Sequence, residues 1–398
     1  MSKLIKITNK IDDFDKTITV SGDKSLSIRW VLFSSLALGK SKAYNLLLSE
    51  DVLAAFDAVK KLGIKVKLDK NYCTLIGKGL SGYKYKKNII INAKNSGTLA
   101  RLIMGILIDS PYKIKIIGDK SLSKRDFYRI AEPLRKFGAE VKLTKKGLPL
   151  TIVGNENLHP IKYLEKRGSA QCKSSVILAG LKTEGKTFIK AKKSRNHTEL
   201  LCKYLDLPIK IKTNKKYDLI EIKKAKKIKP LNYKIPSDIS SGAFFIVLVA
   251  LLDNSKLLIK NVNINSSRIG IITILKKMGV NIKFKNKQNY KGEETADIFI
   301  NSSKRLKAIN CPPELNSGAI DEFLIIFLVA AKANGISYFN DIGELNQKES
   351  PRLKWGSKIL NKMGVKTVTT SSSIKIFGNP NLKVTKKIII KDYLKDHR

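Results

Sequence analysis

Several features that would assign a function directly are scarce in this sequence. The 398 residues include four isolated Cys without a C-x-x-C pair and three His that lie far apart. This scarcity argues against a disulfide framework and a structural metal site. The longest apolar runs, AFFIVLVALL and FLIIFLVAA, have about half of the roughly 20 residues that span a bilayer, and the start lacks the apolar core of a signal peptide. We therefore expect a soluble, cytoplasmic protein without metal or membrane association.

Arginine is also scarce, although the chain is strongly basic. The formal net charge is +44, yet only 11 of the 77 basic residues are Arg. Lys is spread over the whole length, whereas nucleic-acid binders more often concentrate charge on one face and interleave aromatic residues. We expect solvated Lys side chains that attract small anions, and Arg at positions that need a bidentate fork. Six Arg lie near runs of small polar residues: Arg29, Arg101, Arg125, Arg195, Arg352 and Arg398.

What the sequence does contain is repetition. The pattern KKLGIKVKL recurs as RKFGAEVKL, KKMGVNIKF and NKMGVKTVT, with a degraded copy KYLDLPIKI. Each copy predicts an amphipathic helix that ends near Gly, the preferred residue after a C-cap, and then an alternating strand. An apolar helix and another strand precede each copy. Five helix–strand–helix–strand–strand units result, with a period of about 75 residues, and such units stack to bury their cores.

The apolar helices begin with residues that capping does not explain. Ser and Thr suit N-caps, which contribute about 1 kcal/mol each. Lys24, Arg29, Arg101 and Gln171 lie in or just beyond the same first turns. A cation at the positive end of a helix is unfavourable unless an anion lies beside it. The sequence therefore predicts an anion-binding site at these helix starts.

Two segments are similar to a nucleotide-binding loop without fitting one. In SGDKSLSIR, residues 21–29, Asp23 separates Gly from Lys, where a Walker-type loop needs Gly directly before Lys. GLKTEGKT, residues 180–187, matches the pattern letter for letter. It follows a predicted helix and enters a predicted strand, however, whereas a working loop follows a strand and starts a helix. We interpret it as a helix–strand connection.

Eight motifs follow one another along essentially the whole chain: SGDKSLSIR, NSGTLAR, GDKSLSKR, GSAQCKS, SRNHTE, AIDEF, ELNQKESPRL and DHR. In this order and spacing they resemble the 5-enolpyruvylshikimate-3-phosphate synthase family. The resemblance implies enolpyruvyl transfer from phosphoenolpyruvate to the 5-hydroxyl of shikimate 3-phosphate, with release of phosphate, no cofactor and a monomeric enzyme. It implies an α/β fold class, a two-domain inside-out α/β barrel with pseudo-threefold symmetry in each domain. We expect residues 1–20 and 234–398 to form the first domain, residues 21–233 the second, and the active site to lie in the cleft between them.

The resemblance also implies roles for individual residues. Asp321 is the candidate base for the attacking hydroxyl, Glu349 the candidate proton donor and acceptor at the methylene carbon, and Lys24 a bridge between the substrates. Taken singly, Asp321 would be a first-turn acid favoured by the helix dipole, and Glu349 a surface residue. The residues implied for shikimate 3-phosphate are Lys24, Ser25, Arg29, Ser169, Ala170, Gln171, Arg195, Asp321 and Lys348. Those implied for phosphoenolpyruvate are Lys24, Gly97, Arg125, Gln171, Arg352 and Arg398.

The sequence departs from the family pattern in three places. Asp126 stands where Pro is usual, Pro351 stands where Asp is usual, and the chain stops at Arg398 within the last motif. We expect IIIKDYLKDHR to be a strand that leads into a sixth helix, and the strands KLIKIT and KTITVS to complete that sixth unit's sheet. We accordingly expect a fragment of a longer reading frame, poorly soluble and inactive without the remainder.

Three alternatives stay open. UDP-N-acetylglucosamine enolpyruvyl transferase would have the same fold, but with Lys-Asn in place of Lys24-Ser25 and a Cys near the position of Arg125. A basic nucleic-acid-binding protein would account for the charge. An inactive paralogue would keep the motifs without turnover.

Overall fold

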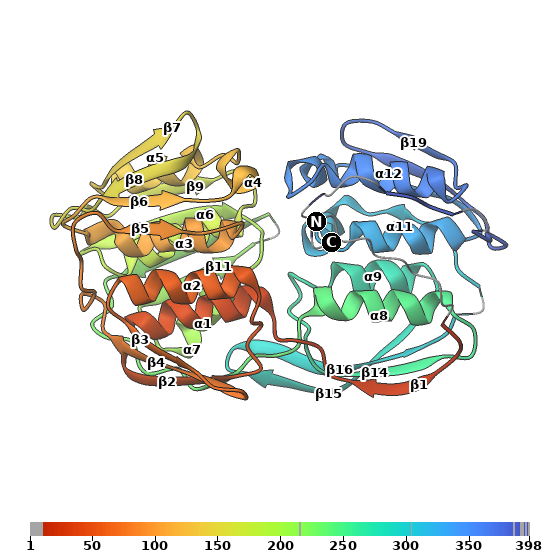
Figure 1. Cartoon of the computed structure of the whole chain (residues 1–398), viewed down its shortest axis with the longest axis horizontal. Helices are drawn as coiled ribbons and strands as arrows, with labels where there is room; N and C mark the ends of the chain where they lie inside the picture. The colour runs from red at the N-terminus through yellow and green to blue at the C-terminus, as the bar shows by residue number, and fades with distance from the viewer. Residues whose placement is uncertain are drawn as a thin grey trace.

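The computed structural model describes residues 11–214, 216–303, 305–384 and 387–390, together with Leu394 and Asp396. It has two halves that lie side by side (Figure 1), and each half has its own hydrophobic core. One core draws its buried residues from Leu26 to Ile235. The other contains Val20 and buried residues from Ile239 to Ile376.

The first half contains three copies of the predicted unit. The first copy comprises α1 (Lys24–Leu36), β2 (Leu38–Tyr44), α2 (Glu50–Lys61), β3 (Lys65–Leu68) and β4 (Tyr72–Lys78). The second comprises β5 (Ile90–Asn92), α3 (Gly97–Ile106), η1 (Leu107–Asp109), β6 (Ile114–Ile117), α4 (Lys120–Ser123), α5 (Tyr128–Lys136), β7 (Glu140–Thr144) and β8 (Gly147–Val153). The third comprises β9 (Lys162–Glu165), α6 (Ala170–Gly180), β10 (Lys186–Lys192), α7 (His197–Tyr204), β11 (Ile209–Thr213) and β12 (Tyr217–Lys223).

The second half contains two further copies. The fourth comprises α8 (Ile239–Leu251), β14 (Lys256–Asn263), α9 (Gly270–Lys277), β15 (Asn281–Tyr290) and β16 (Glu293–Asn301), with β1 (Asp15–Ile18) from the start of the chain. The fifth comprises β17 (Asn310–Cys311), η2 (Pro313–Leu315), α10 (Asn316–Ala319), α11 (Phe323–Lys332), β18 (Gly335–Phe339), η3 (Gly343–Gln347), α12 (Arg352–Lys362), β19 (Thr367–Thr369) and β20 (Ile374–Gly378). The helix–strand–helix–strand–strand prediction is thus confirmed.

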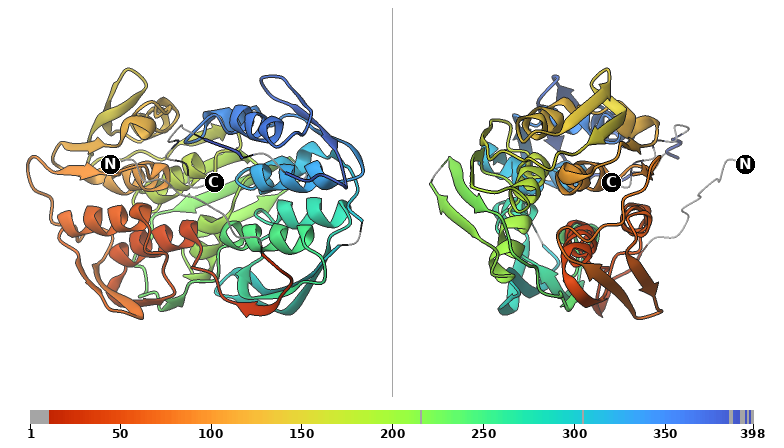
Figure 2. Two further views of the ribbon diagram at one scale, coloured as in Figure 1. Left: turned by 45° about the vertical axis from the view of Figure 1, so that its right-hand side comes forward. Right: turned by 90° about the vertical axis from the view of Figure 1, so that its left-hand side faces the viewer.

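Helices occupy the interior of the first half and sheets its outside. In the right-hand view of Figure 2, which faces this half, the sheets surround helices that are seen end-on. Every side chain of α1 from Leu26 to Leu36 is buried, and so is every residue of α6 from Cys172 to Gly180. A helix surrounded by other elements is expected to be apolar on all sides. GLKTEGKT connects α6 to β10, which confirms the helix–strand connection.

Each sheet also has a short leading strand, and only β1, within KTITVS, was predicted as a strand from the sequence. β5, β9 and β17 pair in parallel with β6, β10 and β18 of their own copies. In the first and fourth copies the leading strands are exchanged between the halves. β13 (Tyr233–Lys234) pairs with β2, and β1 pairs with β14, from Asp15 beside Lys256 to Ile18 beside Ile259.

This exchange corrects the expectation for a sixth unit. KTITVS belongs to the sheet of the fourth copy and not to a sixth one, because the chain upstream of α8 is already paired in the other half. KLIKIT lies outside the described residues. Residues 387–390, expected to be a strand, are not in one.

The two segments that cross between the halves are bonded to each other. Gly22 and Ser237 form an antiparallel bridge, the Asp23 amide donates to the Pro236 carbonyl at 2.8 Å, and the Asp238 amide donates to the Ser21 carbonyl at 2.9 Å. Each segment then enters a helix that is capped by its own Asp. No helix in the described ranges is long and apolar enough to cross a membrane.

Candidate active site

The starts of α1, α3 and α6 lie close together in the first half. Each start is capped by a side chain: Asp23, Ser96 and Ser169 accept from the amides three residues further on. Free N–H groups at such helix ends favour an anion. The predicted anion site would therefore be built from three helix N-termini.

Arg29 joins α1 to the neighbouring helices. It is 3% exposed, and its Nε donates to Thr198 Oγ1 at 2.8 Å, its Nη2 to Ser174 Oγ at 3.2 Å, and its Nη1 to the Ser25 carbonyl at 3.1 Å. All three partners are neutral. Burial lowers the pKa of Arg29 to about 10, partly offset by Glu199. A buried guanidinium with neutral partners favours an anionic ligand.

Arg101 and Gln171 join α3 to α6. Arg101 Nη1 donates to Gln171 Oε1 at 2.9 Å, and Gln171 Nε2 donates to Thr98 Oγ1 at 3.0 Å. Burial, with a further contribution from Arg129, lowers the pKa of Arg101 to about 9. Ser169 and Ala170 are half-buried at the same helix start.

Gly97, the first residue of α3, faces two arginines. A Cβ at this position would lie 2.6 Å from Arg101 Nη1 and 3.1 Å from Arg125 Nη1. Arg125 Nη2 donates to Asn95 Oδ1 at 3.1 Å, and Asn95 Nδ2 donates to Asp119 Oδ2 at 2.7 Å. The absence of a side chain at position 97 therefore keeps space beside two cations.

Asp321 lies in a break in the fifth apolar helix. α10 ends at Ala319 and α11 begins at Phe323, so the helix is interrupted at Asp321. Asp321 Oδ2 accepts from Arg195 Nη2 at 2.6 Å, and Oδ1 accepts from Arg352 Nη1 at 3.3 Å and lies 3.8 Å from Lys348 Nζ. Because Arg195 belongs to the first half, this acid joins the halves.

Glu349 lies between two arginines. Its Oε2 accepts from Arg352 Nη2 at 2.5 Å, and its Oε1 lies 3.4 Å from Arg125 Nη2 of the other half. Burial raises the pKa of this carboxyl, but Arg352 and Arg125 lower it more, so the net pKa is below the ordinary value. Glu349 is not the surface residue that its sequence context alone would indicate, since its side chain is 14% exposed.

The structure brings most of the predicted site residues together, and it adds residues that the sequence analysis missed. Lys24 Nζ lies 3.1 Å from Asp51 Oδ2, in the first turn of α2. Asp396 accepts from Arg352 Nε at 3.0 Å and from Nη2 at 3.1 Å. The DHR motif, which contains Asp396, could have indicated this residue, whereas no motif in the sequence indicated Asp51. Arg398 lies outside the described residues.

The described residues contain no group of three or more His, Cys, Asp or Glu side chains that could hold a metal ion. Asp321 and Glu349 each contact cations that come from both halves. Two ion pairs, Arg195 with Asp321 and Arg125 with Glu349, place this set of residues between the halves.

Proteins of known family match this chain over almost its whole length. Residues 8–398 match the EPSP synthase family, also described as 3-phosphoshikimate 1-carboxyvinyltransferase. The 3-phosphoshikimate 1-carboxyvinyltransferases of Bacillus cytotoxicus and Ruthia magnifica are 38% and 39% identical; the matches cover 92% and 95% of this chain and 86% and 85% of theirs. An EPSP synthase structure from Acinetobacter baumannii matches with a TM-score of 0.82 at 36% identity, over 92% of this chain and 82% of that one. The enolpyruvyl transferase NikO from Streptomyces tendae shares the fold, with a TM-score of 0.70 at 14% identity over 92% and 83% of the two chains. The two-domain inside-out α/β fold class is thereby confirmed, and the chain belongs to the EPSP synthase family.

Proposed function

We propose that this chain transfers the enolpyruvyl group of phosphoenolpyruvate to the 5-hydroxyl of shikimate 3-phosphate and releases phosphate, a step of the shikimate pathway. The observation that carries the proposal is the pairing of Asp321 and Glu349 with cations from both halves. The same cations are suited to bind two small substrates that each carry a carboxylate and a phosphate. Family membership argues against the UDP-N-acetylglucosamine alternative.

Shikimate 3-phosphate would bind mainly to the first half. The buried Arg29 guanidinium, with Ser25 beside it, suits the carboxylate. The N-terminus of α6, with Ser169, Ala170 and Gln171, suits the phosphate. Two cations that now contact Asp321, Arg195 and Lys348, would extend this site to the phosphate and the hydroxyl groups.

Phosphoenolpyruvate would bind between the halves. Its ligands would be Lys24, Gln171, Arg125, which lies beside Gly97, and Arg352. Arg398 would be a further ligand and lies outside the described residues. The substrate's anionic groups would compete with Glu349 for Arg125 and Arg352. When those cations turn to the substrate, burial dominates and raises the pKa of Glu349, which favours the protonated form.

The chemistry then follows from these positions. Glu349 donates a proton to the methylene carbon of phosphoenolpyruvate, while the 5-hydroxyl adds to the neighbouring carbon and gives its proton to Asp321. Glu349 takes a proton back from the resulting methyl group as the bond to phosphate breaks. Arg and Lys side chains stabilise the charge on the leaving phosphate, as prearranged donors do in other enzymes.

Two further assignments belong to the same proposal. The domain boundaries, residues 1–20 with 234–398 and residues 21–233, are supported by the two separate cores. We also propose that the chain acts as a monomer and binds no nucleic acid. Phosphate release measured with both substrates, and with each omitted in turn, tests the activity; phosphate release that needs only one substrate would contradict it.

Gly97→Ala is expected to weaken inhibition by glyphosate, the family's inhibitor at the phosphoenolpyruvate site. The added methyl group would crowd Arg101 and Arg125, and we expect the inhibition constant to rise about tenfold, equivalent to about 1.4 kcal/mol. The KM for the smaller phosphoenolpyruvate should rise less. Inhibition curves at several phosphoenolpyruvate concentrations measure both constants.

Gly242→Ala serves as the control for this substitution. Gly242 lies in α8, and the nearest atom to an added Cβ is Ile259 Cδ1 at an ordinary 3.4 Å. Its inhibition constant should equal that of the unmodified chain. Resistance of the unmodified chain to millimolar glyphosate would show that another part of the pocket differs.

A further inference from the structure

Five consecutive residues at the start of α7 each contact a different part of the molecule. Three contact the second half and two contact the first: Arg195 with Asp321, Asn196 with Asn265, His197 with Glu293, Thr198 with Arg29, and Glu199 with Lys173. These residues are the last five of the SRNHTE motif, of which the proposed function uses only Arg195. The first turn of α7 thus connects the two cores.

Glu293 is the anchor on the side of the second half. It is 2% exposed, and its Oε1 lies 2.7 Å from His197 Nδ1. Its Oε2 accepts from Asn263 Nδ2 at 3.1 Å and from Asn265 Nδ2 at 2.9 Å. Although burial raises the pKa of Glu293, His197 and the two Asn side chains lower it to about 2 overall. Because a carboxylate can only accept, His197 Nδ1 carries the proton in this hydrogen bond.

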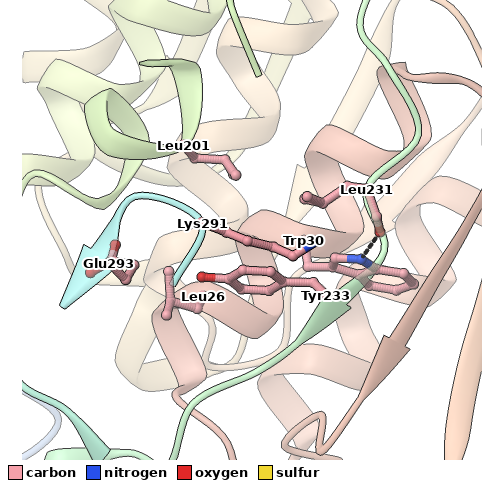
Figure 3. A pocket seen from close by; sticks show the side chains of 7 residues that line it. All are labelled: Leu26, Trp30, Leu201, Leu231, Tyr233, Lys291 and Glu293. Carbon is pink, nitrogen blue, oxygen red and sulfur yellow. Dashed lines mark hydrogen bonds between the residues drawn. The ribbon is translucent and has the colours of Figure 1, made fainter. Parts of the chain in front are cut away.

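The loop that carries Glu293 fits closely against the first half. Figure 3 shows Glu293 and Lys291 beside Leu201 and Tyr233. The cavity there has about 10 Å³ of space, room for roughly one water molecule. Tyr290 stacks on Tyr233 with 5.4 Å between ring centroids, and a Cβ on Gly292 would lie 2.9 Å from the Leu200 carbonyl. The position of Glu293 relative to α7 is therefore fixed.

On the side of the first half, the first turn of α7 contacts Arg29 and closely follows Arg195, two arginines of the site. Thr198 Oγ1 accepts from Arg29 Nε at 2.8 Å and shares a 2.7 Å hydrogen bond with Ser174 Oγ. Arg195 precedes His197 by two residues and reaches Asp321. A shift of the first turn of α7 would therefore move both guanidinium groups.

We propose that Glu293, acting through His197, is a positioning residue that sets the places of Arg29 and Arg195 for shikimate 3-phosphate. This inference rests on the proposed function, which assigns those arginines to that substrate. A buried carboxylate contributes little net stability, because the cost of removing its charge from water offsets the attraction of its partners. The directional hydrogen bonds of Glu293, by contrast, fix the position of the β15–β16 hairpin relative to α7.

Glu293→Ala tests this role and Glu293→Gln is its matched partner. The Gln amide can keep the Asn donors on its oxygen and donate to His197 Nδ1 in the other tautomer, so it retains the link without the charge. A displacement of about 1 Å can cost about 100-fold, and we expect Glu293→Ala to raise the KM and Kd for shikimate 3-phosphate by about 10- to 100-fold. Glu293→Gln should stay within about threefold.

The readouts separate positioning from stability. Kinetics give the KM of each substrate, calorimetry gives the Kd of shikimate 3-phosphate, and thermal unfolding gives the Tm. Lys291→Gln is the control, because Lys291 lies on the same loop and donates to the Asn232 carbonyl without contacting α7's first turn. It should lower the Tm slightly and leave both constants unchanged.

If Glu293→Ala does not fold, His197→Leu removes the link from the α7 side and leaves Glu293 its two Asn donors. The same rise in KM is expected. A variant with lower Tm but unchanged KM and Kd would overturn the positioning role. Failure of the unmodified chain to bind shikimate 3-phosphate would instead count against the proposed function.

Discussion

Asp321→Asn and Glu349→Gln are each expected to lower kcat by about 10²- to 10⁴-fold, the usual contribution of a general acid or base. Both replacements keep the size and much of the hydrogen bonding of the side chain, but neither can take up and release the proton. Rates of phosphate release with both substrates saturating measure the loss. A variant that retains more than about half of the unmodified kcat would exclude its residue from proton transfer.

Binding of shikimate 3-phosphate should survive these replacements within about tenfold, equivalent to about 1.4 kcal/mol. Asp321 contacts Arg195, Arg352 and Lys348, so its neutralisation leaves these cations for the substrate's phosphate. Calorimetry with shikimate 3-phosphate measures the Kd. Loss of binding would show that Asp321 positions these cations and does not act in proton transfer alone.

Arg268→Met is expected to destabilise the fold by about 3–5 kcal/mol, the usual cost of breaking a buried ion pair from one side. Arg268 is 2% exposed and joins the two crossing segments: Nη1 donates to Asp23 Oδ2 at 3.3 Å and Nη2 to Asp238 Oδ1 at 3.2 Å. Nη2 also donates at 2.9 Å to Ser240, which itself donates to Glu322. Without Arg268, two buried carboxylates would lose their shared cation.

Denaturant unfolding measures this change, with Arg167→Met as the control. Arg167 also contacts an Asp, with Nη1 3.4 Å from Asp126 Oδ2, but its side chain is 70% exposed. An exposed pair contributes only about 0–1 kcal/mol. Equal losses for the two variants would contradict the argument that burial makes the Arg268 pairs important.

The repeat and the helix starts could be predicted because local physics sets them. An apolar period of about 3.6 residues, a Gly after the helix and a polar residue before it specify a helix within a dozen residues. Ser96, Ser169 and Asp238 cap helices as such positions should. The motif resemblance then named Asp321, Glu349 and most of the cations around them.

The exchange of leading strands could not be predicted in the same way. β13 has two residues, too few for alternation to indicate a strand. β1 was predicted as a strand within KTITVS, but its partner β14 is far along the chain, as is the partner of β13. The interruption between Ala319 and Phe323 was also missed, because the sequence there keeps a helical apolar pattern.

The sequence by itself determined the repeating unit, the capped helix starts and the family to which the motifs belong, because each depends on neighbouring residues or on their order. The tertiary structure decided which charges meet. Arg195 and Asp321 are 126 residues apart, Arg268 and Asp23 are 245 apart, and His197 and Glu293 are 96 apart. Such pairs depend on how the two cores are joined at the crossing segments, which brings residues far apart in the sequence into contact. No local pattern in the sequence records that choice.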